Sequence, residues 1–235
     1  EKERAGTTFH STSRQAANIA KEAEVDKLLL GHYSSRYKDL IPILNQAKEV
    51  FELLRITAQH KVPAMIMSYW SPIEKYGCAN FAQMVAKMGG SGVITPDLTV
   101  EESADWHRES IKNSIDSIYV VAPSTTDERL SKVSANCSGF IYAASLMGVT
   151  GTRDAVSGNA QSLVGRIRKV SNTPVAVGLG VSTKEQAREV AKYADGVIVG
   201  SAFIKIVQEH GSGRKGLKLV KQLAKSLSEG VRDAR

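Results

Sequence analysis

Few cysteines and no long apolar segment limit the kinds of protein that this sequence can encode. The two cysteines, Cys78 and Cys137, are too few for a disulfide framework and show no metal-ligand spacing. No apolar run approaches the roughly 20 residues that span a membrane, and from the first residues we expect no signal peptide. We therefore expect a cytoplasmic protein that needs no metal, no cofactor and no membrane.

The remaining composition is ordinary for a globular enzyme, with 42% hydrophobic and 23% charged residues among 235. This length fits one (βα) barrel or a modest two-domain protein. The net charge of +7 raises the question of nucleic acid, but much of it lies on one predicted amphipathic helix at the end of the chain. We expect a solvated basic face there and no nucleic-acid partner, and positive charge suits a phosphorylated substrate. The cations of this helix are Arg214, Lys215, Lys218, Lys221, Lys225, Arg232 and Arg235.

Short β-branched runs alternate with longer amphipathic stretches, which predicts βα units around a parallel sheet in a single domain, 1–235. The runs at 64–67 and 197–199 lack polar alternation, so both faces of these strands are expected to be buried. A closed barrel or a doubly wound sheet is favoured over a sandwich. Residues 7–9 are the only candidate for an eighth strand. The seven predicted strands are 27–31, 62–68, 92–95, 117–122, 139–144, 174–178 and 196–200.

Helix starts are indicated by hydroxyl residues followed three positions later by Glu or Gln, the spacing of a capping box. The pairs are Thr12 with Gln15, Thr99 with Glu102, Thr125 with Glu128, and Ser182 with Glu185. A further helix is expected from about residue 39, because apolar residues recur on one helical face. These residues are Leu40, Ile43, Leu44, Ala47, Val50, Phe51 and Leu54.

Three glycine-bearing turns follow the last three predicted strands, at 148–152, 178–182 and 200–202. Glycine lets the backbone approach an anion closely, and a following helix N-terminus supplies amide donors and a positive dipole. Glycine in one such turn alone would be attributed to the backbone geometry of the turn and not to ligand binding. Three at consecutive strand ends, with the hydroxyl of Ser201 beside them, predict a phosphate site of the kind that (βα)8 barrels place after their last strands.

Five short segments resemble tryptophan synthase α chains, in the same order and at the same separations. The segments are 68–72 (SYWSP), 94–98 (ITPDL), 142–145 (YAAS), 148–151 (GVTG) and 199–202 (VGSA). The resemblance runs from about Leu54 to Arg235. It implies a (βα)8 TIM-barrel-like fold and retro-aldol cleavage of indole-3-glycerol phosphate to indole and glyceraldehyde 3-phosphate.

The resemblance also implies roles for single residues. Tyr142 matches a tyrosine beside the catalytic base, and Tyr69 matches one in the indole pocket. Asp97 matches a loop aspartate involved in signalling to a β chain, and Ser71 replaces an asparagine of the same surface. From the residues alone, Tyr142 could be a packed core tyrosine and Asp97 a turn or capping residue. The residues implied to hold the substrate phosphate are Gly151, Gly180, Gly200 and Ser201, with Leu179 where many members carry Phe.

The front of the chain departs from this pattern. Family members end the second strand in Glu-Leu-Gly or Glu-Val-Gly and follow it with a Ser-Asp-Pro loop. In the family, the carboxylates of this Glu and this Asp carry the chemistry. When Gly31 is placed on the family glycine, Leu29 takes the position of the Glu, and no Ser-Asp-Pro follows. Leucine cannot transfer a proton, so we expect phosphate binding with badly impaired lyase activity and no catalytic residue beyond the supporting Tyr142 and Asp97.

Residues 1–52 instead resemble the C-terminal part of ribonuclease Z, a zinc-dependent endonuclease, with His10 and His32 in its histidine motifs. The other metal ligands of that family are missing, so no zinc site is expected. The sequence therefore indicates a chimera whose first βα units are replaced, and the lack of a clear first strand predicts some homodimerisation. The alternatives to a phosphate-binding α-chain derivative are a non-catalytic recombined fold and, third, a tRNA-processing hydrolase.

Overall fold

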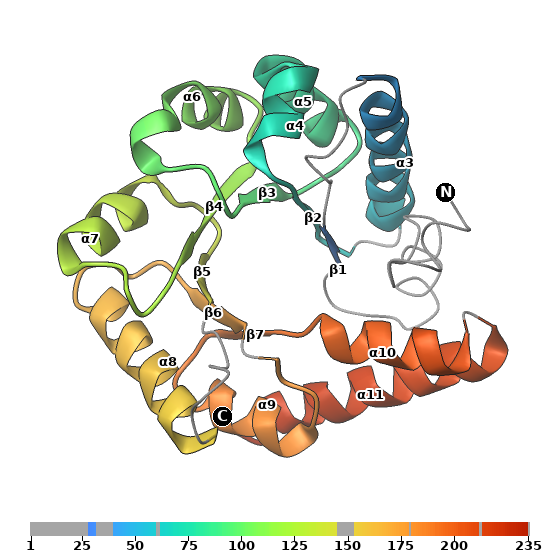
Figure 1. Cartoon of the computed structure of the whole chain (residues 1–235), viewed down its shortest axis with the longest axis vertical. Coiled ribbons are helices and arrows are strands. Elements are labelled where there is room, and N and C mark those ends of the chain that lie inside the picture. The colour runs from blue at the N-terminus through green and yellow to red at the C-terminus, as the bar shows by residue number, and fades with distance from the viewer. Residues whose placement is uncertain are drawn as a thin grey trace. The chain divides into compact units, whose positions relative to one another are not determined.

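The computed structural model describes residues 28–31, 40–59, 62–144, 153–178, 180–211 and 213–234, with the backbone alone at 28–31, 40–47 and 153–158. Strands and helices alternate through this part of the chain (Figure 1). The strands are β1 (Leu28–Gly31), β2 (Ala64–Met67), β3 (Gly92–Thr95), β4 (Asp116–Val121), β5 (Ile141–Ala144), β6 (Val175–Gly178) and β7 (Gly196–Ile198). The helices are α3 (Leu40–Gln59), α4 (Trp70–Tyr76), α5 (Cys78–Lys87), η1 (Val100–Glu102), α6 (Ala104–Lys112), α7 (Asp127–Asn136), α8 (Arg153–Arg168), α9 (Lys184–Ala191), α10 (Ser201–His210) and α11 (Arg214–Arg232).

All seven predicted strands are present, and each pairs in parallel with the next in chain order, β1 to β7. The α/β prediction is thus confirmed. Several strands are shorter than predicted, since pairing ends before the apolar run does: 62–68 becomes Ala64–Met67 and 139–144 becomes Ile141–Ala144. The candidate eighth strand at 7–9 and the pair Thr12 and Gln15 lie outside the described residues.

The chain divides into two compact units, Glu1–Tyr119 and Val120–Arg235, and the boundary falls within β4. The prediction of a single domain remains a prediction. Within the described part of the chain, no helix is both long and apolar enough to cross a membrane.

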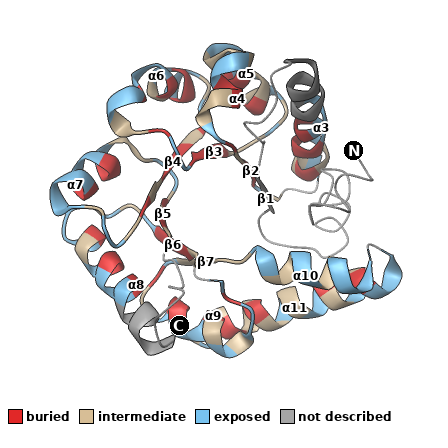
Figure 2. Ribbon diagram, in the orientation of Figure 1, coloured by how far each residue is buried: buried red, intermediate tan, exposed pale blue. Residues whose placement is uncertain are grey.

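The core of the first unit lies between the strands and their covering helices. Ala64, Ile66 and Val93 of β2 and β3 are fully buried and pack with Phe51 and Leu54 of α3. Since side chains alternate along a strand, Met65 and Ile94 belong to the opposite face of the sheet. Aromatic rings complete the core in edge-on and tilted pairs, among them Phe51 with Phe81, Phe81 with Trp106, and Trp70 with Trp106. Buried residues follow the strands and the inner sides of the helices (Figure 2).

The predicted helix caps are displaced by one residue in two places. The α7 cap is Thr126, whose hydroxyl accepts from the amide of Arg129, whereas Thr125 accepts from the amide of Ala122. The α9 capping box is formed by Thr183 and Gln186. In both places two hydroxyl residues are adjacent. At α9 both fit the spacing of a capping box, whereas at α7 the spacing favours Thr125 and the structure uses Thr126.

The third predicted capping box, Thr99 with Glu102, is also wrong. The residue after Thr99 begins the short 3-10 turn η1, in which no side-chain cap forms. The Thr99 hydroxyl instead donates to the Glu102 carboxylate at 2.7 Å.

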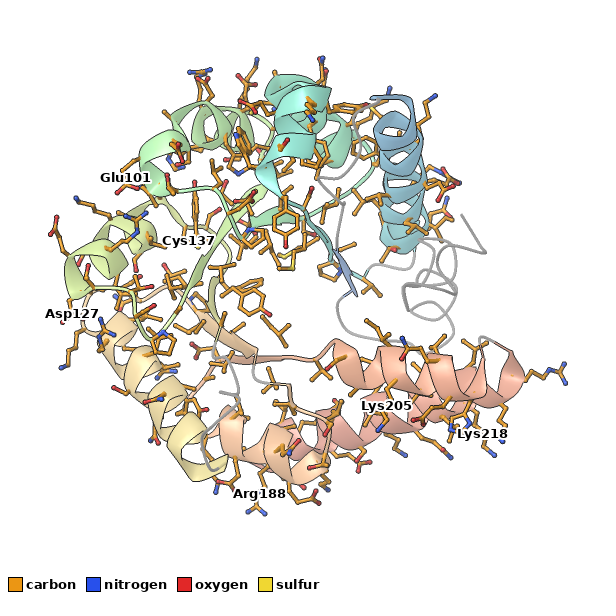
Figure 3. The ribbon with its side chains drawn as sticks, in the orientation of Figure 1. Glu101, Asp127, Cys137, Arg188, Lys205 and Lys218 are labelled. Carbon is orange, nitrogen blue, oxygen red and sulfur yellow. The ribbon has the colours of Figure 1, made fainter. Side chains whose placement is uncertain are left out.

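In the second unit the C-terminal helix α11 packs along α9 (Figure 1). Val220 and Leu227 are buried, and the ammonium group of Lys184 pairs with Asp233 at 2.9 Å and Glu229 at 3.8 Å. Arg188 of α9 and Lys218 of α11 extend from the outer surface of this helix pair (Figure 3). The predicted amphipathic helix with an exposed basic face is therefore confirmed.

At Gly230 the backbone of α11 lies close to the first residue of α9, and we expect Gly230→Ala to destabilise the protein. A Cβ at this position would collide with the carbonyl oxygen of Lys184, which is backbone and cannot rotate away. Overpacking of this kind costs about 1–3 kcal/mol, to be measured as a lower urea midpoint. Gly165→Ala on α8 is the control, because its Cβ would meet no atom within 4 Å. Equal midpoints for the two variants would contradict this packing.

Candidate functional site

In the second unit, the register brings the ends of three strands to one edge of the sheet. Ala144 of β5 pairs with Gly178 of β6, and Gly178 pairs with Ile198 of β7. Because the strands are parallel, the turns that follow them leave from this same edge. The glycine-bearing turns after β6 and β7 are therefore neighbours. The turn after β5, which contains Gly151, and Leu179 after β6 lie outside the described residues.

Gly180, in the turn after β6, adopts a backbone that favours glycine. Its φ is +68°, in the left-handed region where side chains are strained. The residue is exposed, and a Cβ built on it would meet no atom of the described residues within 4 Å. The backbone of this turn is thus open to a ligand on the side where a side chain would project.

Gly200 and Ser201 form the start of α10. The Gly200 carbonyl accepts from the amides of Phe203 at 3.0 Å and Ile204 at 3.3 Å, which begins the helix. Among the residues that the structure describes, no side chain caps this helix start, and both Gly200 and Ser201 are exposed. The first amides of a helix have no partner within it, and its dipole is positive there, so the start of α10 can receive an anion.

The start of α9, after the neighbouring turn, differs because it is already capped. The Gln186 carboxamide oxygen accepts from the amides of Ser182 at 2.8 Å and Thr183 at 3.3 Å, and Thr183 caps the Gln186 amide in return. These donors are occupied by the protein itself. An anion at this edge would therefore find donors in the Gly180 turn and at α10 rather than at α9.

Tyr142 lies across Gly178 at the same edge. A Cβ on Gly178 would stand 2.5 Å from the Tyr142 hydroxyl and 2.7 Å from Cε2, so the ring occupies the space that a side chain would need. Tyr142 is only half-buried, whereas its strand neighbours Ile141 and Ala143 are fully buried. It is thus partly exposed, unlike its neighbours on the strand. Burial raises the pKa of the Tyr142 phenol, so the hydroxyl stays protonated at neutral pH and can donate a hydrogen bond.

In the first unit, Tyr69 and Asp97 belong to the turns after β2 and β3. Both carboxylate oxygens of Asp97 accept from the amide of Trp70, at 2.9 and 3.1 Å. Asp97 is therefore a capping residue, but for α4 of the preceding βα unit rather than for its own segment. Tyr69, the residue before Trp70, is 37% exposed.

Other reactive groups of the described residues do not form a second centre. Burial, with Glu109 and Asp105 nearby, raises the pKa of the Cys78 thiol to about 11, so this sulfur stays protonated and is a poor nucleophile. Within the described ranges, no group of three or more His, Cys, Asp or Glu is arranged to hold a metal ion. His10 and His32 lie outside those ranges.

These features define the chain as a TIM-barrel-like α/β protein, with its candidate residues at the carboxyl ends of parallel strands. The model of the family "Tryptophan synthase alpha chain" matches residues 44–232, and the chain belongs to this family.

Curated relatives and solved structures agree with this assignment. The Streptomyces avermitilis tryptophan synthase alpha chain is 51% identical over 170 residues, 72% of this chain and 61% of the relative. The Thermobifida fusca protein is 50% identical over 190 residues, covering 80% and 70%. A structure of Mycobacterium tuberculosis tryptophan synthase superposes with a TM-score of 0.79 at 36% identity, covering 96% of this chain and 89% of the other. A chain of the Pyrococcus furiosus tryptophan synthase α2β2 complex superposes with a TM-score of 0.81 at 28% identity, covering 92% and 93%.

The family match refines the boundary expected from the sequence. It begins at residue 44, inside α3, rather than at Leu54. The expected resemblance of residues 1–52 to ribonuclease Z has no support in these comparisons, and the family match includes residues 44–52. The sequence also missed the role of Gly178, which it treated as part of a turn. In the sequence, Gly178 is recognisable only as a small residue at the end of a strand. The register of β5 and β6 is needed to place it beside Tyr142.

Proposed function

We propose that the chain binds a phosphorylated ligand, indole-3-glycerol phosphate or glyceraldehyde 3-phosphate, through the edge formed by the β6 and β7 turns. The observation that carries this is the open start of α10 beside the left-handed, exposed Gly180. Gly200 and Ser201 supply amides and a hydroxyl, and the family resemblance adds Gly151 and Leu179. Tyr142 contributes a protonated phenol at the same edge.

The retro-aldol reaction of the family is proposed to be strongly reduced in this chain. Leu29 lies in β1, paired with Met65 of β2, at the position where the resemblance expects the proton-transferring Glu. Without that carboxylate and without the Asp of a Ser-Asp-Pro loop, proton transfer and charge stabilisation at the indole ring lack their groups. Binding and turnover are thus expected to be separable.

Ligand binding is testable by thermal unfolding with glyceraldehyde 3-phosphate or glycerol phosphate. A ligand that binds only the folded chain raises its free energy of unfolding by RT ln(1 + [L]/Kd), which appears as a higher melting temperature. Sulfate at equal ionic strength separates a general anion effect from recognition of the organic phosphate. No shift at millimolar ligand would count against the proposal.

The hydroxyl of Ser201 is expected to strengthen this binding. Ser201→Ala removes one hydrogen bond to the phosphate and should weaken affinity about three- to ten-fold, measured by calorimetric titration. Ser182→Ala is a matched control, because Ser182 lies in the neighbouring turn and its hydroxyl contacts Gln186 at 3.2 Å. Equal affinities for the two variants would exclude Ser201 from the phosphate site.

The β chain of tryptophan synthase is the proposed protein partner. The Pyrococcus furiosus relative is described as part of an α2β2 complex. By the family resemblance, Asp97 and Tyr69 match residues near the surface that contacts the β chain.

A cytoplasmic setting and partial homodimerisation also stay proposals, and homodimerisation is testable by light scattering. The ribonuclease Z resemblance of residues 1–52 stays a hypothesis about origin, and stoichiometric zinc in the purified protein would give it a functional meaning.

A further inference from the structure

We propose that Asp97 is a positioning residue that holds Tyr69 in place through the backbone of Trp70. This inference rests on the proposed function, since Tyr69 is assigned to the indole end of the ligand. It differs from a role at the surface of a partner, because the contact that carries it lies within the chain.

The start of α4 depends on Asp97 for its cap. Tyr69, the N-cap residue, makes no side-chain capping bond, and the first turn of α4 contains no acidic residue. The Asp97 carboxylate, from 27 residues further along, contacts the Trp70 amide with both oxygens. A charged acceptor at a helix start satisfies an amide and the positive end of the dipole together.

The residue before Tyr69 is hydrogen-bonded to β3, the strand that precedes the turn containing Asp97. The Ser68 amide donates to the Ile94 carbonyl of β3 at 3.1 Å, and the Ser68 hydroxyl donates to the Tyr69 carbonyl at 3.0 Å. Tyr69 therefore lies between two anchors, Ser68 and Trp70, both of which reach β3 or the turn after it. A displacement of the β3 turn is therefore expected to displace Tyr69 as well.

The position of the β3 turn is itself fixed by the core. Leu98, next to Asp97, is 6% exposed within the cluster that contains Trp106, and Trp70 meets Trp106 edge-on with ring centroids 6.2 Å apart. The chain contains only these two tryptophans. Their near-ultraviolet circular dichroism consequently reports whether Asp97 still holds the start of α4.

The experiment compares Asp97→Ala and Asp97→Asn with the parent, with Glu74→Gln as control. Glu74 is an exposed acid on α4 that does not cap it, so its replacement removes the same charge without the contact. We expect Asp97→Ala to lose near-ultraviolet dichroism and to weaken indole binding about five-fold, with glycerol phosphate affinity unchanged. Asp97→Asn keeps a carbonyl acceptor and should retain most of both properties.

Two results would overturn the proposal. One is an Asp97→Ala variant with parental dichroism and parental indole affinity. The other is an equal loss of indole and phosphate affinity with a lower melting temperature, which indicates general destabilisation. If the alanine variant does not fold, Asp97→Glu, which keeps the charge but displaces the carboxylate, is expected to show the same selective loss. Failure of the parent to bind glycerol phosphate would reject the proposed phosphate site, while the dichroism still tests the Asp97 contact.

Discussion

Gly178→Ala is expected to displace the Tyr142 ring and to lower both stability and ligand affinity. The new methyl group would stand 2.5–3.0 Å from the hydroxyl, Cε2 and Cζ of Tyr142. The residue sits within the β6 ladder, paired with Ala144 and Ile198, so its backbone cannot withdraw without breaking register. The ring must therefore move, at a cost of about 1–3 kcal/mol.

The distinguishing measurement is a double-mutant cycle with Tyr142. Combining Gly178→Ala with Tyr142→Ala removes the clash, so the pair should be more stable than the sum of the single effects predicts. Tyr142→Phe removes only the hydroxyl contact, and the ring carbon at 2.7 Å from the Cβ position remains, so rescue should be partial. Urea unfolding gives the cycle, and calorimetry gives the affinity for glycerol phosphate. Strictly additive effects would mean that the two residues do not share this space.

The strands were predictable because each is a continuous apolar run, whereas their ends depend on pairing. Residues 92–95 were predicted without error, since glycine before them and a Pro-Asp turn after them bound the run. The 62–68 run was predicted too long, because Ser68 continues the contact to β3 by one amide but no longer belongs to a strand. Local sequence thus sets the type of an element and leaves its limits to the neighbouring chain.

The site residues were predictable one at a time but their partners were not. Gly180 and Gly200 were found because glycine after a strand signals a turn. The ring of Tyr142 over Gly178, and the Asp97 carboxylate on Trp70, join residues of different βα units. No periodicity within one segment encodes such contacts, which follow from strand register. The Gln186 carboxamide is a local case instead, since it occupies the amides of Ser182 and Thr183 within its own turn.

Register also bears on position 29 of β1. Leu29 pairs with Met65, and Leu30 pairs with Ile66, which faces the helix-covered core. Since strand positions alternate between faces, position 29 belongs with Met65 on the face opposite that core. The resemblance expects the catalytic carboxylate of the family at position 29, and the register pairs this position with Met65.

Leu29→Glu is expected to raise indole release from indole-3-glycerol phosphate well above the parent chain. General acid–base groups contribute about 10²–10⁴-fold to the rates of such reactions. Indole release by the parent chain is therefore expected to be slower than that of the Streptomyces avermitilis relative by at least about that factor. Recovery should be incomplete, because the Asp of the Ser-Asp-Pro loop is not restored.

Two control variants test the role of the carboxylate. Leu29→Gln has nearly the same shape as Leu29→Glu but cannot transfer a proton, and Leu30→Glu places the carboxylate on the alternate face. Only Leu29→Glu should show an activity that depends on its own ionisation, visible as a pH profile absent from both controls. Thermal unfolding of each variant separates lost activity from lost fold. Parental turnover near that of the relative, or equal turnover for Leu29→Glu and Leu29→Gln, would show that proton transfer in this chain does not depend on position 29.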